Sequence, residues 1–198
     1  MYNSSIKGQN FDFDGKLSHF IEVPHKVFFN DMSKDFWHDD FKDCDVVYSE
    51  IAWPYGYPRF NEKAGNKPNN YAQYMNNIER LINKLNVPAF IICGKNVARY
   101  FPDAKQYSFA ITTSGTNMQG CTLYVWNYDY DNKHATTDQL IDFLAQNFKK
   151  CLDFSCGYGE HLLKFDDFVG CDINRKCLTY LSIILQEKLN DDSSSNGK

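Results

Sequence analysis

CLDFSCGYGEHLLKFDDFVGCDIN, residues 151–174, combines two apolar runs with a glycine turn. The first run ends at Cys156, the chain turns through Gly157 and Gly159, and the second run ends at Asp172. Glycines let the backbone approach a ligand, and ligands of open α/β sheets lie beyond the carboxyl ends of the strands. An acid at the end of the second strand can accept hydrogen bonds from both hydroxyls of a ribose. The stretch therefore predicts the nucleotide-binding part of an α/β domain.

The order of features in this stretch is more specific than its glycines alone. A strand, Asp153, the glycine turn, a helix, a second strand and Asp172 are expected to follow one another. Neither GxGxxG nor GKS/GKT occurs, so a dinucleotide fingerprint and a P-loop are both poor interpretations.

Strand-like runs and helical patterns alternate along the whole chain. Three amphipathic patterns predict helices at 71–85, 136–148 and 175–189, the second with Thr136 or Thr137 as N-cap. Seven short runs predict strands, at residues 26–31, 45–50, 88–94, 107–113, 121–127, 151–156 and 168–172. The alternation predicts an α/β fold whose mostly parallel sheet is covered on both faces. The polar connection at 114–120 predicts one antiparallel hairpin at an edge.

The composition is that of one globular, acidic domain. The chain has 198 residues, 43% of them hydrophobic, and a formal net charge of -4. Non-specific nucleic-acid binding needs clustered Lys and Arg, so this charge does not favour it, although a local basic face is left open. The richness in Asn, Lys and Tyr suggests an AT-rich genome, such as that of a phage.

The cysteines and the apolar runs point to the cytoplasm. The seven Cys lie mostly in apolar runs, without a CxxC pair or zinc-like spacing, which favours reduced core thiols and no metal site. The N-terminus has no signal-peptide core, and no apolar stretch approaches the roughly 18 residues of a membrane span. We therefore expect a cytoplasmic protein that does not enter a membrane.

The C-terminal third of the chain resembles a known family. HATT at 134–137 precedes an amphipathic helix, and LDFSCGYGEH and FVGCDIN follow it. This order is similar to the segments H-P-T-x-K-P, L-D-P-F-x-G-S-G and F-x-G-x-D/E of the Rossmann-like amino-methyltransferases that modify adenine N6 or cytosine N4. The similarity departs at two places: Asp138-Gln139 replace the K-P, and Tyr158-Gly159-Glu160 replace an S-G-T.

The resemblance implies a fold, a cofactor and a domain plan. It implies a seven-stranded methyltransferase sheet in circularly permuted order, with the catalytic half first, and S-adenosylmethionine (SAM) as cofactor. The plan is an N-terminal extension at 1–24, a single domain at 25–189 divided into a catalytic half (25–130) and a SAM-binding half (131–189), and a disordered tail at 190–198. SAM would contact His134, Thr136, Asp153, Ser155, Cys156, Gly157, Gly159, Asp172 and Ile173.

A second segment, DVVYSEIAWPYG at 45–56, resembles the family's catalytic loop. It is similar to the D-P-P-W-P-Y-G version of adenine methyltransferases related to the RNA N6-adenosine enzymes, with Glu50 in place of Asp and Ile51-Ala52 in place of the two prolines. In the family, an acid or amide accepts hydrogen bonds from the target amine, and the aromatic residue stacks on the extruded base. The resemblance therefore assigns catalysis to Glu50, Trp53, Pro54 and Tyr55.

The substrate side is less specific. The polar loop at 55–70 carries Arg59, Lys63 and Lys67, which are candidates for gripping phosphates of DNA or RNA. The chain has no room for a separate target-recognition domain. This favours target recognition through partner subunits, in a homo- or hetero-oligomer, or the use of short substrates.

Three functions remain open at this point. The first is a SAM-dependent methyltransferase acting on an exocyclic amine, with adenine N6 in DNA or RNA as the expected target. The second is a catalytically impaired relative that binds SAM or nucleic acid as a partner subunit, which the Glu50-Ile51-Ala52 departure motivates. The third is an enzyme acting on SAM itself or on a small amine.

Overall fold

Seven strands form one sheet in the computed structural model, which describes residues 26–51, 71–113, 116–134 and 136–195. The strands are β1 (Lys26–Phe29), β2 (Val46–Glu50), β3 (Ala89–Gly94), β4 (Lys105–Thr113), β5 (Thr116–Trp126), β6 (Lys150–Asp153) and β7 (Asp167–Asp172). Their spatial order is β1-β7-β6-β2-β3-β5-β4. The first five in this order run parallel, and β5 and β4 add an antiparallel hairpin at one edge. The predicted α/β fold, with a mostly parallel seven-stranded sheet and an antiparallel edge hairpin, is confirmed.

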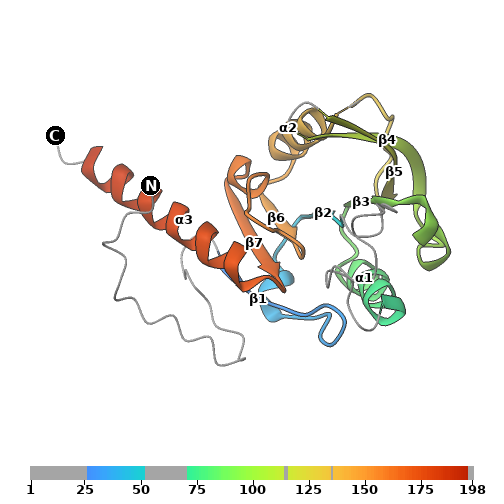
Figure 1. Cartoon of the computed structure of the whole chain (residues 1–198), viewed down its shortest axis with the longest axis horizontal. Coiled ribbons are helices and arrows are strands. Elements are labelled where there is room, and N and C mark those ends of the chain that lie inside the picture. The colour runs from blue at the N-terminus through green and yellow to red at the C-terminus, as the bar shows by residue number, and fades with distance from the viewer. Residues whose placement is uncertain (1–25, 52–70, 114–115, 135, 196–198) are drawn as a thin grey trace.

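Helices cover both faces of this sheet. The helices are α1 (Tyr71–Leu85), α2 (Thr137–Asn147) and α3 (Arg175–Ser195). Figure 1 shows α2 and α3 on one side of the sheet and α1 on the other. Successive side chains of a strand point to opposite faces, so Val46 and Tyr48 are buried in the core cluster that includes residues of α2 and α3, while Val47 is buried in the cluster that includes residues of α1.

Three elements differ from the sequence-based expectation. Between the glycine turn and β7, the expected helix is replaced by a three-residue 3-10 helix (Leu162–Lys164), because the residues between Gly159 and Asp167 amount to less than two α-helical turns. Helix α3 continues six residues beyond its predicted end, to Ser195, since no glycine or proline interrupts the sequence before Gly197.

The edge hairpin is the third difference. Thr113 pairs with Thr116, so most of the polar connection predicted at 114–120 belongs to β5. The ladder hydrogen bonds come from the backbone, so polar residues can extend a hairpin as apolar ones do, and two-residue turns are the commonest hairpin connection.

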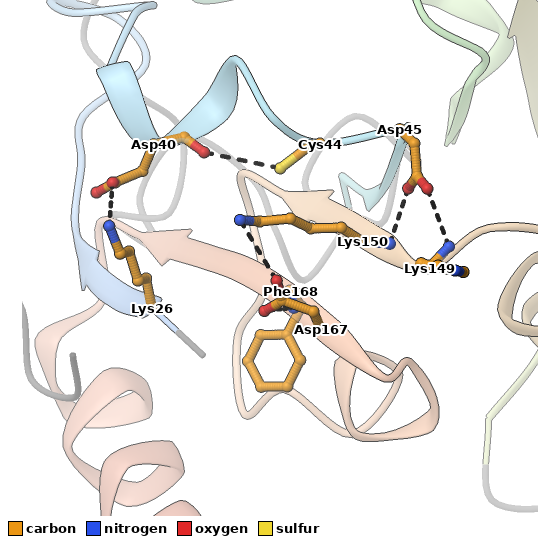
Figure 2. Close-up of polar contacts among 8 residues, drawn as sticks. All are labelled: Lys26, Asp40, Cys44, Asp45, Lys149, Lys150, Asp167 and Phe168. Carbon is orange, nitrogen blue, oxygen red and sulfur yellow. Dashed lines mark hydrogen bonds and ion pairs between the residues drawn. The ribbon is translucent and has the colours of Figure 1, made fainter. Parts of the chain in front are cut away.

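The starts of β1, β2, β6 and β7 form what we call the amino edge of the sheet. Here the Asp45 carboxylate accepts the backbone N–H groups of Lys149 and Lys150, at 3.0 and 2.8 Å. The Lys150 ammonium lies 3.4 Å from the Asp167 carboxylate (Figure 2). These contacts fasten the start of β2 to the starts of β6 and β7.

A second ion pair at the amino edge joins β1 to a neighbouring turn. Lys26 pairs with Asp40, which lies in a 3-10 helix (Asp39–Phe41), and the Cys44 thiol lies 3.9 Å from the Asp40 carbonyl (Figure 2). All seven cysteines are free and buried. Among the described residues, no helix has the length and hydropathy that crossing a bilayer requires.

Candidate functional site

Three acids stand at the carboxyl ends of three neighbouring strands. Glu50 ends β2, Asp153 ends β6 and Asp172 ends β7, and these strands lie side by side in parallel. Parallel strands bring their carboxyl ends to one edge, which is where open α/β sheets bind ligands. We call this region, together with the turn at 154–161, the carboxyl edge.

The glycine turn folds directly onto Asp172. The Gly157 N–H donates to Asp172 Oδ2 at 2.8 Å, and the Asn174 N–H donates to Oδ1 at 2.7 Å. Both glycines of the turn have positive φ, +53° at Gly157 and +73° at Gly159, a region that side chains disfavour. A Cβ at Gly159 would also lie 2.5 Å from the Leu181 side chain of α3. Glycine is therefore required at 159 by both backbone conformation and packing.

The Asp172 carboxyl is nearly buried and has no strong counter-charge. Burial raises its pKa, while the N–H groups of Asn174 and Gly157 lower it by a smaller amount. Each carboxylate oxygen offers about two lone-pair sites, so Asp172 can still accept hydrogen bonds after accepting these two.

Asp153 is buried between β2 and the turn. Its Oδ1 accepts the Ser49 hydroxyl at 2.7 Å and the Ser155 N–H at 3.0 Å. Burial raises the pKa of Asp153 to about 7, and the nearby charge of Asp172 contributes in the same direction. A proton is therefore gained or lost at this carboxyl near neutral pH.

Glu50 faces a histidine from the turn. Its Oε1 accepts the Tyr48 hydroxyl at 2.6 Å and lies 3.3 Å from His161 Nε2. Burial lowers the pKa of His161, but the hydrogen bond and charge of Glu50 outweigh it, so the pKa is raised overall. This contact joins the end of β2 to the segment that carries the glycines.

Helix α1 contributes a tyrosine to the surroundings of Asp172 and Ser155. The Tyr74 side chain is buried, and burial, followed by the charge of Asp172, raises the pKa of its phenol. The Ser155 side chain hydrogen bonds to this phenol and opposes the shift. Asp153 and Asp172 are thus approached by uncharged hydroxyls and backbone N–H groups.

The charges of the carboxyl edge define which ligands it suits. Among the described residues, no Lys or Arg pairs with Glu50, Asp153 or Asp172; the one basic partner is His161. Such an edge suits a ligand that carries positive charge or donates hydrogen bonds, and it disfavours phosphates. No group of three or more His, Cys, Asp or Glu side chains within the described ranges is arranged to hold a metal ion.

Several predicted cofactor residues gather here. Ser155 and Cys156 follow Asp153, and the Cys156 N–H donates to the Cys171 carbonyl at 3.1 Å, which ties the turn to β7. Ile173 follows Asp172 and is 55% exposed, an unusual position for a large apolar side chain. Its exposure leaves an apolar surface beside the acid.

His134 and Thr136 have other contacts. His134 stacks on Phe143 and Tyr130, with ring centroids 4.5 and 5.7 Å apart, and its Nδ1 lies 3.2 Å from the Tyr130 hydroxyl. Thr136 is the N-cap of α2 and accepts the Gln139 N–H at 3.3 Å, as predicted. These contacts account for both residues in structural terms, and their part in cofactor binding stays a prediction.

Six predicted residues lie outside the described part of the chain. They are the catalytic candidates Trp53, Pro54 and Tyr55 and the phosphate-binding candidates Arg59, Lys63 and Lys67.

Ser49 and His161 are among the residues of the site that were not predicted. Ser49 joins β2 to Asp153 at the end of β6, and His161 joins the segment after β6 to Glu50. Neither belongs to a recognised motif. The available signal was positional: Ser49 precedes the predicted acid on a strand, and His161 follows the second glycine by two residues.

Comparison with known proteins identifies the fold. No protein-family model and no curated protein matches the sequence. The crystal structure of M1.HpyAVI matches 82% of this chain and 98% of its own, with a TM-score of 0.51 and 14% identity. The fold is that of M1.HpyAVI.

Two further solved structures match over similar lengths. The M1.HpyAVI–SAM complex covers 80% of this chain and 97% of its own, at TM-score 0.50 and 12% identity. TTHA0409 from Thermus thermophilus, proposed to be a DNA modification methylase, covers 80% of this chain and 92% of its own, at TM-score 0.49 and 9% identity.

Proposed function

We propose that the chain is a SAM-dependent methyltransferase that acts on an exocyclic amine, adenine N6 in DNA or RNA. The observation that carries the proposal is the carboxyl edge, where Asp172 holds a glycine turn beside two further acids and no described Lys or Arg pairs with them. SAM has a cationic sulfonium, an ammonium and two ribose hydroxyls, so it fits this edge better than a nucleoside phosphate does. M1.HpyAVI, which shares the fold, has been crystallised with SAM.

The residues divide into two roles under this proposal. Asp172 accepts the ribose hydroxyls with its remaining lone pairs, and the exposed Ile173 packs on the adenine ring. The positive-φ turn at Gly157 lets the backbone come close to the ligand. Bound SAM supplies the methyl group, while Glu50, with Trp53 to Tyr55, holds the target amine.

The strand order supports the permuted arrangement. β6 and β7 come last in the chain, yet they lie inside the sheet between β1 and β2. A circular permutation that moves the SAM-binding strands to the end of the chain accounts for this order. It also explains why the nucleotide-binding pattern comes last in the sequence.

Calorimetric titration with SAM tests the cofactor part of the proposal. We expect micromolar binding by the natural protein and at least tenfold weaker binding by Asp172→Asn, which cannot accept two hydroxyls in the same way. Asp167→Asn is the matched control, because Asp167 lies at the other end of the same strand. No heat of binding at millimolar SAM would exclude SAM as the ligand.

Transfer of labelled methyl groups tests the substrate part. Adenine-containing DNA and RNA, and the same polymers with N6-blocked adenine, are incubated with labelled SAM and the protein. We expect the labelled methyl group to appear in the polymer with free adenine N6 and not in the polymer with blocked adenine. Breakdown of SAM without polymer labelling, or labelling of a small amine, would replace this substrate class by an enzyme acting on SAM or on small amines.

One observation favours a second candidate, a non-catalytic SAM- or nucleic-acid-binding partner subunit. The Ile51 N–H donates to the Ile92 carbonyl at 2.9 Å, so the pairing of β2 with β3 continues where the resembling motif has a proline, which has no N–H. A proline at position 51 could not donate this hydrogen bond. Restoring Asp-Pro-Pro at 50–52 separates the candidates: a gain of transfer favours the partner subunit, and robust transfer by the natural protein excludes it.

A further inference from the structure

The Glu50 carboxylate is held by one of its two oxygens. Oε1 accepts the Tyr48 hydroxyl at 2.6 Å and faces His161 Nε2 at 3.3 Å. The rings of Tyr48 and His161 also meet edge to face, with centroids 5.7 Å apart. No described group contacts Oε2 within hydrogen-bonding distance. Among the described residues, the carboxylate is therefore held through Oε1 and not through Oε2.

Tyr48 and His161, which contact Oε1, are themselves fixed by their surroundings. Tyr48 is fully buried and lies two residues before Glu50 on the same face of β2. His161 belongs to the segment that Asp172 fastens through the Gly157 N–H. Glu50 is thus oriented from within its own strand and from the proposed cofactor turn at once.

We propose that His161 is a positioning residue: with Tyr48 it holds Glu50 Oε1, so that Oε2 meets the target amine and takes the proton that the amine must lose. The inference rests on the proposed function. In the transfer step, the amine lone pair bonds to the methyl carbon. The carbon–sulfur bond breaks, with its electron pair left on sulfur, and one N–H proton of the amine passes to Oε2. Glu50 then returns this proton to water.

This arrangement compensates for the missing prolines. Ile51-Ala52 cannot stiffen the loop as a proline pair does, and Glu50 has one methylene more than Asp. A misplacement of about 1 Å can cost roughly 100-fold in rate. Two side-chain hydrogen bonds to one oxygen supply the orientation that the backbone does not.

The surroundings of His161 favour its charged form. Burial lowers the pKa of His161, but the hydrogen bond with Glu50 and the charges of Glu50, Asp153 and Asp138 outweigh it. The pKa of His161 therefore lies above the usual 6.5. Above that raised pKa, His161 loses its charge, and its hydrogen bond to Glu50 loses strength. The turnover number should therefore fall as pH rises through the pKa of His161.

Three variants separate positioning from simple structural support. We expect His161→Ala to lower kcat by about 100-fold, with SAM affinity changed less than threefold. His161→Gln keeps a neutral donor, so it should retain kcat within about tenfold of the natural protein and lose the decline at high pH. Tyr48→Phe should lower kcat while keeping that decline. Asp167→Asn, at the opposite edge, should leave both unchanged.

An NMR titration of the His161 ring gives a readout that needs no activity. The His161 signals, assigned by their loss in His161→Gln, should titrate above 6.5 in the natural protein, and Glu50→Gln should move the pKa down by more than half a unit. An unchanged pKa in Glu50→Gln, or identical pH profiles of natural protein and His161→Gln, would overturn the inference. A third outcome is that SAM binds and His161 titrates as expected, but no methyl group is transferred. This result would overturn the proposed function and the amine-facing role of Glu50, and only the contact between His161 and Glu50 would remain.

Discussion

The two edges of the sheet differ in the surroundings of their acids. At the amino edge, Asp167 faces the Lys150 ammonium at 3.4 Å, and Asp45 accepts two backbone N–H groups. At the carboxyl edge, Asp153 and Asp172 accept only neutral donors and burial raises their pKa. Both edges are built from the ends of the same strands, so the sheet alone does not dictate the difference.

The difference separates structural acids from acids kept for a ligand. A carboxylate beside a lysine, such as Asp167, has its charge compensated within the protein. A buried carboxylate without a cation is a cost to folding, and such perturbed groups gather at functional sites. The carboxyl edge has this cost to folding. Such a cost is expected of a site that binds a positively charged ligand.

The largest expected effect concerns activity and lies wholly at the carboxyl edge. Glu50→Gln should reduce methyl transfer at least 100-fold, because an amide takes up no proton from the amine. Single-turnover transfer measures this. Asp167→Asn serves as the control at the amino edge. Equal losses in the two variants would mean that the edges do not differ in function.

The next effect is a pH dependence of stability. The folded pKa of Asp153, about 7, exceeds its unfolded value of 3.8, so its contribution to stability is present below pH 3.8 and is lost as pH rises to 7. Asp153→Asn keeps an acceptor for Ser49 and Ser155 but does not titrate.

Denaturant unfolding of natural and Asp153→Asn protein at pH 5 and pH 8 checks this. Between these values the variant should gain about 3 kcal/mol relative to the natural protein. Asp45→Asn, at the amino edge, is the matched control. A difference independent of pH would show that burial does not raise the pKa of Asp153.

A smaller loss of stability is expected from the amino edge. Asp45→Ala removes the acceptor of two backbone N–H groups, those of Lys149 and Lys150, and should cost about 2 kcal/mol. SAM affinity should not change. Chemical unfolding and calorimetry measure the two quantities, and weakened SAM binding would show that the edges are coupled.

The smallest effect concerns the Lys150–Asp167 pair. Lys150→Met keeps the apolar stem and removes the charge, and the pair is partly exposed, so the loss should be under about 1 kcal/mol. The loss should vanish in about 1 M salt. A larger loss that resists salt would mean that the amino edge relies on this ion pair for its structure.

Much of the fold could be predicted because it depends on local patterns. Helix α1 was expected at 71–85 and occupies those residues, since its apolar residues recur at helical spacing. The predicted helix after Gly159 was wrong, because the motif suggested an element for which the connection is too short. Hydrophobic periodicity indicates which face of a helix or strand is buried. It does not indicate whether the segment between two strands is long enough to form a helix.

The acids at strand ends and the glycine turn could be located from the amino-acid order, because strands end where apolar runs end and positive φ favours glycine. The partners of those acids depended on the three-dimensional arrangement. Ser49 and Asp153 are 104 residues apart in the chain and 2.7 Å apart in space, and Glu50 meets His161 in the same way. Such contacts follow from the placement of β6 beside β2, which long-range sheet pairing sets and no local pattern encodes.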